Sequence, residues 1–183
     1  MTGLLLKVVV AALQKYPGFN ASLDEATGEI IYKHYYHLGV AVDTEQGLIV
    51  PVLRDVDKKS IKQLSTELAA LAEKTRQRKV SIEDLQGGTF TISNLGSIGG
   101  SYFTPIVNKP EVAILGVARG VQKPMVMKSV SKSKTAAPKI EVRMMLPLAL
   151  SYDHRVVDGA DGARFIREIV QGLENFKESE LKL

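Results

Sequence analysis

The chain contains 183 residues, of which 45% are hydrophobic and 24% are charged, proportions that are ordinary for a globular domain. It has no cysteine, which excludes disulfide bonds, thiolate metal sites and a thiol nucleophile. The net charge of +4 is small and the basic residues form no long tract with aromatic residues, so nucleic-acid binding has little support. The length predicts one domain with a hydrophobic core of its own.

The most apolar run of the chain, LLLKVVVAAL at residues 4–13, lies close to its N-terminus. Lys7 interrupts this run, which is shorter than the roughly 18–20 apolar residues that span a bilayer, and no basic segment precedes it as in a secretory signal. We therefore predict no membrane span, and a helix over 2–16 that is mostly buried and ends at Pro17-Gly18. A buried helix that begins at the second residue also leads us to expect further sequence upstream of it.

A sheet region is expected after this helix. Alternation of apolar and polar residues with a period of two predicts strands over 29–33, 36–43 and 47–54. At Ser60 the period changes to three and four residues, which predicts a helix over 60–77. Ser60 and Gln63 have the spacing of a capping box at its start.

The next part of the chain returns to strand patterns. A second possible cap, Ser81-Ile-Glu-Asp84, predicts a short helix that ends at Gly87-Gly88. Residues 89–93 alternate, which places Thr89, Thr91 and Ser93 on one face of a strand and Phe90 and Ile92 on the other. The almost wholly apolar segment 111–117 predicts a strand that is buried on both faces.

Segment 123–139 interrupts these patterns with serine and lysine residues, which predicts a solvated hairpin tip or loop, with a basic binding site as the alternative. Strand character returns over 140–150, and apolar residues at helical spacing predict an amphipathic helix over 160–177. Helices grouped against one large mixed sheet predict an α/β fold of the two-layer α+β sandwich type. We find no internal repeat and no linker, so residues 1–183 are expected to form a single domain.

The three histidines differ in what their positions allow. His34 and His37 stand three residues apart in an extended segment, where their side chains point to opposite faces, so they are poor co-ligands and we predict no metal site. His154 lies in SYDHRVVDGADG at 151–162, directly after an apolar strand and before the last helix. A sheet commonly presents catalytic groups at such a junction, on loops held by rigid elements. His154 is therefore the main candidate for catalytic chemistry.

Asp158 follows His154 by four residues, and this spacing alone leaves three interpretations open. The carboxylate could orient His154 as a base, or it could form half of a metal site with it. It could also have a structural role, as the cap of the following helix or as the partner of an arginine.

The motif His154-Arg-Val-Val-Asp158-Gly159 resembles the H-x-x-x-D-G signature of the acyltransferase superfamily that includes chloramphenicol acetyltransferase and the dihydrolipoyl acyltransferase cores of 2-oxo acid dehydrogenase complexes. Four segments resemble the catalytic domain of the second group in amino-acid sequence and in order along the chain, and they lie at 17–23, 39–61, 87–117 and 145–165. The sequences of these segments are most similar to the acetyl-transferring members of pyruvate dehydrogenase complexes. The branched-chain and succinyl-transferring members come second and third in similarity.

This resemblance implies a fold like that of chloramphenicol acetyltransferase. The catalytic domain of the family extends further at its N-terminus, where it supplies a strand and part of the coenzyme site. The chain is therefore expected to lack the first part of the family domain. The lipoyl domain and the peripheral-subunit-binding domain of the family have no counterpart in this sequence.

The resemblance also implies a reaction, the transfer of an acyl group between the dihydrolipoyl arm of a carrier domain and coenzyme A. A thiol with a pKa near ~8.5 is mostly protonated at neutral pH, so it needs a nearby base to attack a thioester. The resemblance implies that His154 is this base. It also implies that the Ser93 hydroxyl stabilises the negative charge that forms on the thioester oxygen. Asp158 would fix the His154 loop and ring, through an arginine rather than by direct contact.

Further matches concern the binding of coenzyme A. In the family, Asp43 matches a position near the coenzyme side of the channel. Phe103 and Leu115 match apolar positions around the pantetheine arm, with plain core packing as the alternative for both.

Two other functions compete with this interpretation. A serine hydrolase could use Ser93, His154 and Asp158 as a triad, but a nucleophile elbow requires G-x-S-x-G and Ser93 stands between Thr91 and Leu95 instead of two glycines. A non-catalytic scaffold that only assembles a larger particle is the second competitor. Binding of coenzyme A would distinguish an enzyme from a scaffold.

The resemblance finally implies partners and an assembly. It predicts a homotrimer with each channel at a subunit boundary, where His154 enters from one chain and Ser93 from the next, and further assembly into a cubic or dodecahedral core. The expected partners are the lipoyl domain, the 2-oxo acid decarboxylase and the dihydrolipoyl dehydrogenase, in the cytoplasm or, in a eukaryote, the mitochondrial matrix. Leu181 and Leu183 in the C-terminal ESELKL are expected to dock into a neighbouring trimer, with a frayed tail as the alternative.

Overall fold

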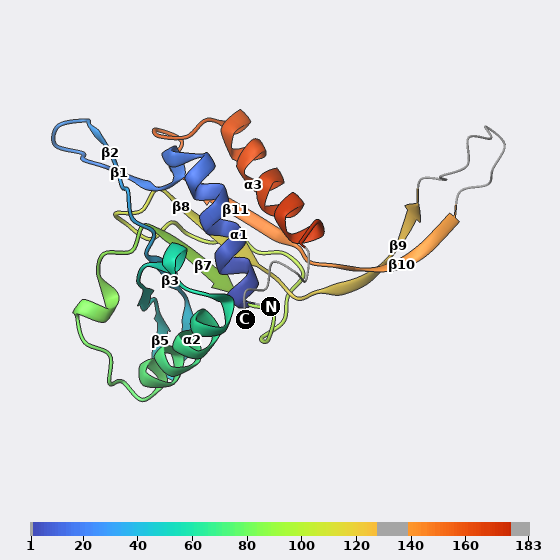
Figure 1. The fold of residues 1–183 in the computed structure, drawn as a ribbon, viewed down its shortest axis with the longest axis horizontal. Helices are drawn as coiled ribbons and strands as arrows, with labels where there is room; N and C mark the ends of the chain where they lie inside the picture. The colour runs from blue at the N-terminus through green and yellow to red at the C-terminus, as the bar shows by residue number, and fades with distance from the viewer. Residues whose placement is uncertain (1, 128–138, 177–183) are drawn as a thin grey trace.

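Three helices lie on one side of a five-stranded sheet, and a two-stranded ribbon projects away from both layers (Figure 1). This arrangement comes from a computed structural model that describes residues 2–127 and 139–176. The predicted mixed sheet with packed helices is confirmed. No helix among the described residues is long and apolar enough to cross a membrane.

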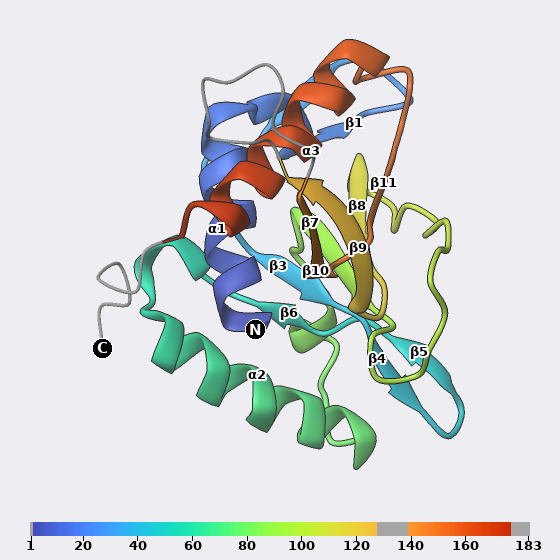
Figure 2. The same cartoon turned by 90° about the vertical axis from the view of Figure 1, so that its right-hand side faces the viewer.

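The central sheet has the strand order β11-β8-β7-β3-β6 (Figure 2). Its strands are β3 (Leu38–Val40), β6 (Val52–Leu53), β7 (Phe90–Asn94), β8 (Ala113–Val117) and β11 (Leu148–Tyr152). The three middle strands β3, β7 and β8 are parallel, and the outer strands β6 and β11 pair with them in the antiparallel sense. β7 is therefore the centre of the sheet, with a parallel neighbour on each side.

The helix layer is built on α1 (Thr2–Lys15), which packs against both α2 (Ile61–Arg76) and α3 (Gly159–Glu174). The predicted capping box at the start of α2 is present, because Ser60 and Gln63 each accept a hydrogen bond from the other's backbone N–H. Phe165 of α3 joins the helices to the sheet, because its ring centroid lies 5.7 Å from that of Phe90 on β7, and it also stacks on Phe19 at a centroid distance of 4.0 Å. The predicted helices over 2–16, 60–77 and 160–177 are confirmed within one to three residues.

Three two-stranded hairpins lie outside the central sheet. They pair β1 (Ala21–Leu23) with β2 (Ile30–Tyr32), β4 (Val42–Thr44) with β5 (Gly47–Ile49), and β9 (Val121–Met127) with β10 (Lys139–Met145). Single 3₁₀ turns, η1 (Pro17–Phe19), η2 (Val56–Lys58) and η3 (Glu83–Leu85), complete the chain. The short helix expected after Ser81 is therefore only one 3₁₀ turn.

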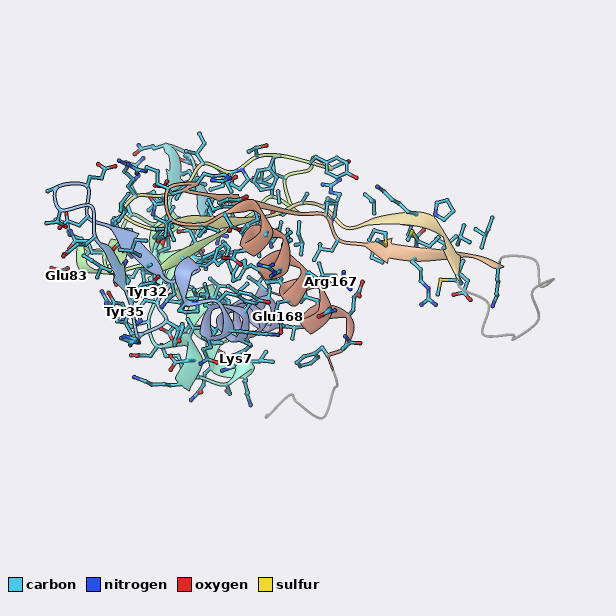
Figure 3. The ribbon with its side chains drawn as sticks, turned by 90° about the horizontal axis from the view of Figure 1, so that it is seen from above. Lys7, Tyr32, Tyr35, Glu83, Arg167 and Glu168 are labelled. Carbon is cyan, nitrogen blue, oxygen red and sulfur yellow. The ribbon has the colours of Figure 1, made fainter. Side chains whose placement is uncertain are left out.

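The prediction of a loop from residue 123 was wrong at its first residues. β9 continues to Met127, which pairs with Lys139 of β10, and together they form the projecting ribbon (Figure 3). Lys123 and Pro124 lie on a two-stranded ribbon whose strands are joined by backbone hydrogen bonds. These two residues therefore do not end the strand. Residues 128–138, where the tip of the predicted hairpin falls, and the predicted C-terminal docking segment lie outside the described residues.

Candidate active site

His154 lies in a tight turn between β11 and α3. The backbone N–H of Asp153 donates a 2.8 Å hydrogen bond to the carbonyl of Val112, and the N–H groups of Val156 and Val157 donate to the carbonyl of Asp153. The imidazole is exposed, and its centroid lies 5.8 Å from that of Tyr152. The turn thus holds a histidine at the surface on a backbone that is fixed at both ends.

Arg155 adds side-chain bonds to this turn. Its guanidinium donates to both carboxylate oxygens of Asp153 at 2.7–3.1 Å and to Glu25, in the turn after β1, at 3.0 Å. Lys109 also lies 3.0 Å from Glu25. The hydrogen bond from Arg155 lowers the pKa of Asp153, and the bonds from Lys109 and Arg155 lower the pKa of Glu25. These four side chains tie three loops together through their ion pairs.

Asp158 caps the last helix. Its side chain accepts a 2.8 Å hydrogen bond from the backbone N–H of Asp161, in the first turn of α3. Within the described part of the chain, Arg155 pairs with Asp153 and Glu25 and makes no bond to Asp158. The structure therefore gives Asp158 the capping geometry that was one of its three possible roles, and it does not provide the arginine link.

Ser93 lies on β7 with an exposed fraction of 6%. Phe90 and Ile92 of the same strand belong to the hydrophobic core beneath the helices, so alternation places Thr91 and Ser93 on the opposite face, here called the open face. Ser93 pairs in register with Gly116 of β8. The predicted separation of polar and apolar residues on this strand is confirmed.

Ser93 and His154 are far apart within one chain. Ser93 lies beside Gly116, Gly116 lies opposite Ala149 of β11, and Tyr152 is three residues further along that strand. With about 3.3 Å per residue and about 4.8 Å between strands, Ser93 and Tyr152 are already roughly 14 Å apart, and His154 lies beyond Tyr152. A single chain therefore does not bring these two side chains together.

The three candidates for coenzyme A binding have different surroundings. Phe103 packs over the open face beside Ser93, because a Cβ on Gly116 would lie only 2.8 Å from its ring. Leu115 is fully buried in the core on the helix side of the sheet, away from Ser93. Asp43 is exposed on the β4–β5 hairpin, where it pairs with Leu48. This hairpin follows β3 in the chain and lies at the end of the sheet that carries Ser93.

A cavity that the described residues form on the other side of the sheet is not the candidate site. It measures about 650 Å³ and lies among the helices, where Lys7 of α1 and Glu168 of α3 line it (Figure 3). The sheet separates it from the open face, so its volume does not make it the candidate site. In the described residues no group of three His, Asp or Glu side chains could hold a metal ion, and His37 accepts a 3.0 Å hydrogen bond from the Asp55 backbone through Nδ1.

Sequence reasoning missed one buried acid close to Ser93. Glu111, which precedes β8, is 6% exposed and accepts a 2.6 Å hydrogen bond from Thr91 Oγ1. Burial raises the pKa of Glu111 to about 7, although the hydrogen bond from Thr91, the charge of Lys33 and a hydrogen bond from Asn108 oppose this rise. The available signal was a carboxylate at the head of the otherwise apolar segment EVAILGV.

The catalytic-domain family of 2-oxoacid dehydrogenase acyltransferases matches residues 1–181. A curated relative, the dihydrolipoyllysine-residue acetyltransferase component of the pyruvate dehydrogenase complex of Buchnera aphidicola subsp. Acyrthosiphon pisum, is 53% identical over 171 residues, which are 93% of this chain and 41% of that protein. Its counterpart from Cupriavidus necator is 48% identical over 97% of this chain and 30% of its own length. The chain thus spans less than half the length of these relatives.

Solved structures agree with this assignment. The dihydrolipoamide acetyltransferase of Azotobacter vinelandii, whose mechanism has been studied through a serine, a histidine and an asparagine, superposes with a TM-score of 0.86 at 49% identity, over 95% of this chain and 68% of that one. The cubic core of a pyruvate dehydrogenase multienzyme complex gives a TM-score of 0.86 at 48% identity, with the same coverage.

A chloramphenicol acetyltransferase superposes with a TM-score of 0.60 at 13% identity, over 94% of this chain and 77% of that chain, which shows a shared fold. The fold predicted from the sequence resemblance is therefore confirmed. Together with the family match over residues 1–181, these similarities show that the chain belongs to the 2-oxoacid dehydrogenase acyltransferases, as a member of their catalytic-domain family.

Proposed function

We propose that this chain transfers an acetyl group between the dihydrolipoyl arm of a carrier domain and coenzyme A, as the core of a pyruvate dehydrogenase complex. The observation that carries this proposal is the presence of both the H-x-x-x-D-G turn at His154 and Ser93 on the open face in a chain that is about half identical to named acetyltransferase components. Branched-chain and succinyl transfer are the alternatives for the acyl group.

The reaction follows from the chemistry of the two residues. The Nε2 atom of His154 removes the proton from the thiol of coenzyme A, and the resulting thiolate attacks the carbonyl carbon of the S-acetyldihydrolipoyl thioester. The carbonyl oxygen becomes negatively charged, and the Ser93 hydroxyl donates a hydrogen bond to it. When the tetrahedral intermediate collapses, the bond to the dihydrolipoyl sulfur breaks and that sulfur takes the proton from His154. No acyl-enzyme forms in this scheme.

The same residues favour a site between two subunits. Ser93 and His154 are roughly 14 Å or more apart in one chain, which is too far for one tetrahedral intermediate to contact both. A closed three-fold ring would provide three equivalent boundaries at which His154 of one chain meets Ser93 of the next. Phe103 shares the open face with Ser93 and would contact the pantetheine arm, with Asp43 further out at the coenzyme end. Leu115 is fully buried in the core, so we expect it to stabilise β8 by packing and not to contact coenzyme A.

The proposal extends to the assembly. Relatives form the cubic core of a pyruvate dehydrogenase complex. We propose a trimer that assembles into such a core in the cytoplasm and works with lipoyl domains, a 2-oxo acid decarboxylase and a dihydrolipoyl dehydrogenase. In the proposal, residues 1–183 act as one catalytic domain.

A comparison of acyl donors tests this function. The chain, and a version extended at the N-terminus with the corresponding segment of a relative, are assayed with acetyl-, isobutyryl- and succinyl-coenzyme A as donors to dihydrolipoamide. The proposal predicts the highest kcat/KM for acetyl-coenzyme A. Preference for another donor would replace the acetyl assignment, and an extended version that binds coenzyme A but transfers none of the three groups would overturn the enzyme function in favour of a scaffold.

A further inference from the structure

The Thr91–Glu111 pair occupies a space that the sheet provides for it on the open face. A Cβ on Gly39 of β3 would lie 2.7 Å from Thr91 Oγ1, and a Cβ on Gly88 would lie 2.6 Å from Glu111 Oε1. Any side chain at either glycine would therefore displace one member of the pair. The hydrogen bond between Thr91 Oγ1 and Glu111 Oε2, 2.6 Å long, is buried.

The pair is directly coupled to Ser93 by strand geometry. Thr91 and Ser93 are two residues apart on β7, so their side chains project from the same face about 7 Å from each other along the strand. β8 carries the second link, because Ser93 pairs with Gly116 of the strand that Glu111 precedes. A bond that ties Thr91 to the segment before β8 therefore adds a side-chain link to the two strands that hold Ser93.

The charge of Glu111 affects the same region. Lys33, which is half-buried and whose own pKa burial lowers, is the cation that faces it most closely. The cavity of about 300 Å³ beside Glu111 is lined by further charged residues, and these are Asp24, Glu25, Lys109, Asp153 and Arg155. Four of these five are already bonded to one another. The Glu111 carboxylate lies beside Thr91 and Gly88, so an ionised Glu111 would place negative charge on the same face of the sheet as the oxyanion that Ser93 stabilises, at least about 7 Å from it.

We propose that Glu111 is a positioning residue for Ser93, acting through its hydrogen bond with Thr91. The expected change in kcat rests on the proposed acyl transfer, whereas the expected effect on the order of β7 does not. The neutral carboxyl of Glu111 can accept the bond from Thr91 without opposing the oxyanion. The ionised carboxylate keeps the bond and opposes the oxyanion electrostatically.

The test compares two matched pairs of variants. Thr91→Val keeps the shape of the side chain and removes the hydroxyl, whereas Thr91→Ser keeps the hydroxyl. Thr91→Val is expected to lower kcat about tenfold with little change in the KM for coenzyme A, and Thr91→Ser is expected to restore most of the rate. Equal kcat values for the two variants would overturn the proposal.

Glu111→Gln supplies a second arm, because glutamine keeps an accepting oxygen and has no charge. The ratio of kcat for Glu111→Gln to kcat for the wild type is followed from pH 5.5 to pH 8.5, so that the titrations of His154 and the thiols, common to both proteins, cancel. The ratio is expected to rise about threefold to tenfold as Glu111 of the wild type ionises. A ratio that stays constant with pH would overturn the proposal even if Thr91→Val does not fold.

A structural measurement separates this proposal from the proposed function. Hydrogen–deuterium exchange of the β7 segment, measured by mass spectrometry, is expected to be faster in Thr91→Val than in Thr91→Ser. If the wild type transfers no acyl group, the proposed function fails and this exchange difference alone decides the role of Glu111 in positioning Ser93. Identical exchange in the two variants would overturn that role.

Discussion

The carboxylate of Asp158 lies 2.8 Å from the backbone nitrogen of Asp161, so α3 begins with a side-chain cap four residues after His154. An acidic cap is also favourable at the positive end of the helix dipole. The hydrogen bond joins the end of the His154 turn to a helix whose buried residues belong to the main core. Asp158 therefore acts on the candidate base through the backbone.

This geometry predicts how Asp158 variants behave. Asp158→Ala removes the cap and is expected to lower the free energy of unfolding by about 1 kcal/mol, whereas Asp158→Asn keeps an accepting oxygen and is expected to cost less. Chemical denaturation measures both values. Acyl transfer by Asp158→Asn should stay close to that of the wild type. A rate as low as that of Asp158→Ala, at normal stability, would show that the negative charge itself is needed.

Replacing His154 tests the base. His154→Ala is expected to lower kcat by about 10²–10⁴-fold, the usual contribution of general acid–base catalysis. The imidazole is exposed and accepts no hydrogen bond among the described residues, so folding and assembly should be unchanged by light scattering. His34→Ala, at another exposed histidine, is the control and should keep full activity. Retention of most of the activity by His154→Ala would remove His154 from the mechanism.

The separation of Ser93 and His154 on the sheet predicts complementation. In a trimer built only of His154→Ala chains, or only of Ser93→Ala chains, each of the three subunit boundaries lacks one of the two proposed groups. After co-expression with random mixing, about a quarter of the boundaries should join an intact His154 to an intact Ser93, and activity should rise well above that of either parent. Mixed trimers, verified by two affinity tags, that are no more active than the parents would reject a shared site.

Glu111 makes the stability of the fold depend on pH. Its pKa is about 7 in the folded protein and near 4.5 in the unfolded chain, so the folded state holds a proton that unfolding releases. The free energy of unfolding should therefore decrease as pH rises from about 4.5 to about 7, by about 3 kcal/mol for this group. Glu111→Gln removes this dependence, and its stability relative to the wild type should increase over that window. A difference that is the same at pH 5 and pH 8 would contradict the shifted pKa.

The C-terminal segment tests the larger assembly. Deletion of residues 179–183, which include Leu181 and Leu183, is expected to reduce a large particle to trimers, because an apolar pair after a polar stretch is suited to docking on another subunit. Multi-angle light scattering measures the particle mass. Replacement of Ser179 and Lys182 by alanine in the 183-residue chain is the control. An unchanged mass after the deletion would reject the docking role.

Local patterns predicted the helices well, but they did not show where some of the predicted strands divide or how the strands pair. The helix over 2–16 is defined by its own apolar residues and by Pro17, so a local signal was sufficient. The predicted strand 36–43 is instead two strands, because β3 pairs with β6 and β7 in the central sheet whereas β4 leaves that sheet to pair with β5. Alternation shows which residues share a face, but not which strand lies beside them.

The candidate site shows a similar limit. The role of Ser93 came from resemblance to a family, whereas His154 was also indicated by its position between a strand and the last helix. No spacing in the sequence indicates that the two residues lie at different ends of the sheet. That separation depends on the register of three strands, from Ser93 through Gly116 to Ala149. The pairing of Glu111 with Thr91 could not be recognised, because the two residues are 20 positions apart and only the fold brings them together.

Ser93 and His154 also differ in how firmly the fold holds them. β7 is the central strand, covered on one face by the core and paired on both edges, so Ser93 can move only if the whole sheet opens. His154 stands on a surface turn held by a few backbone bonds and by exposed ion pairs. Mild heat or denaturant is therefore expected to loosen the turn that carries His154 before the strand that carries Ser93. If the two residues act as proposed, activity would be lost before the fold unfolds, and it would return on cooling without refolding of the sheet.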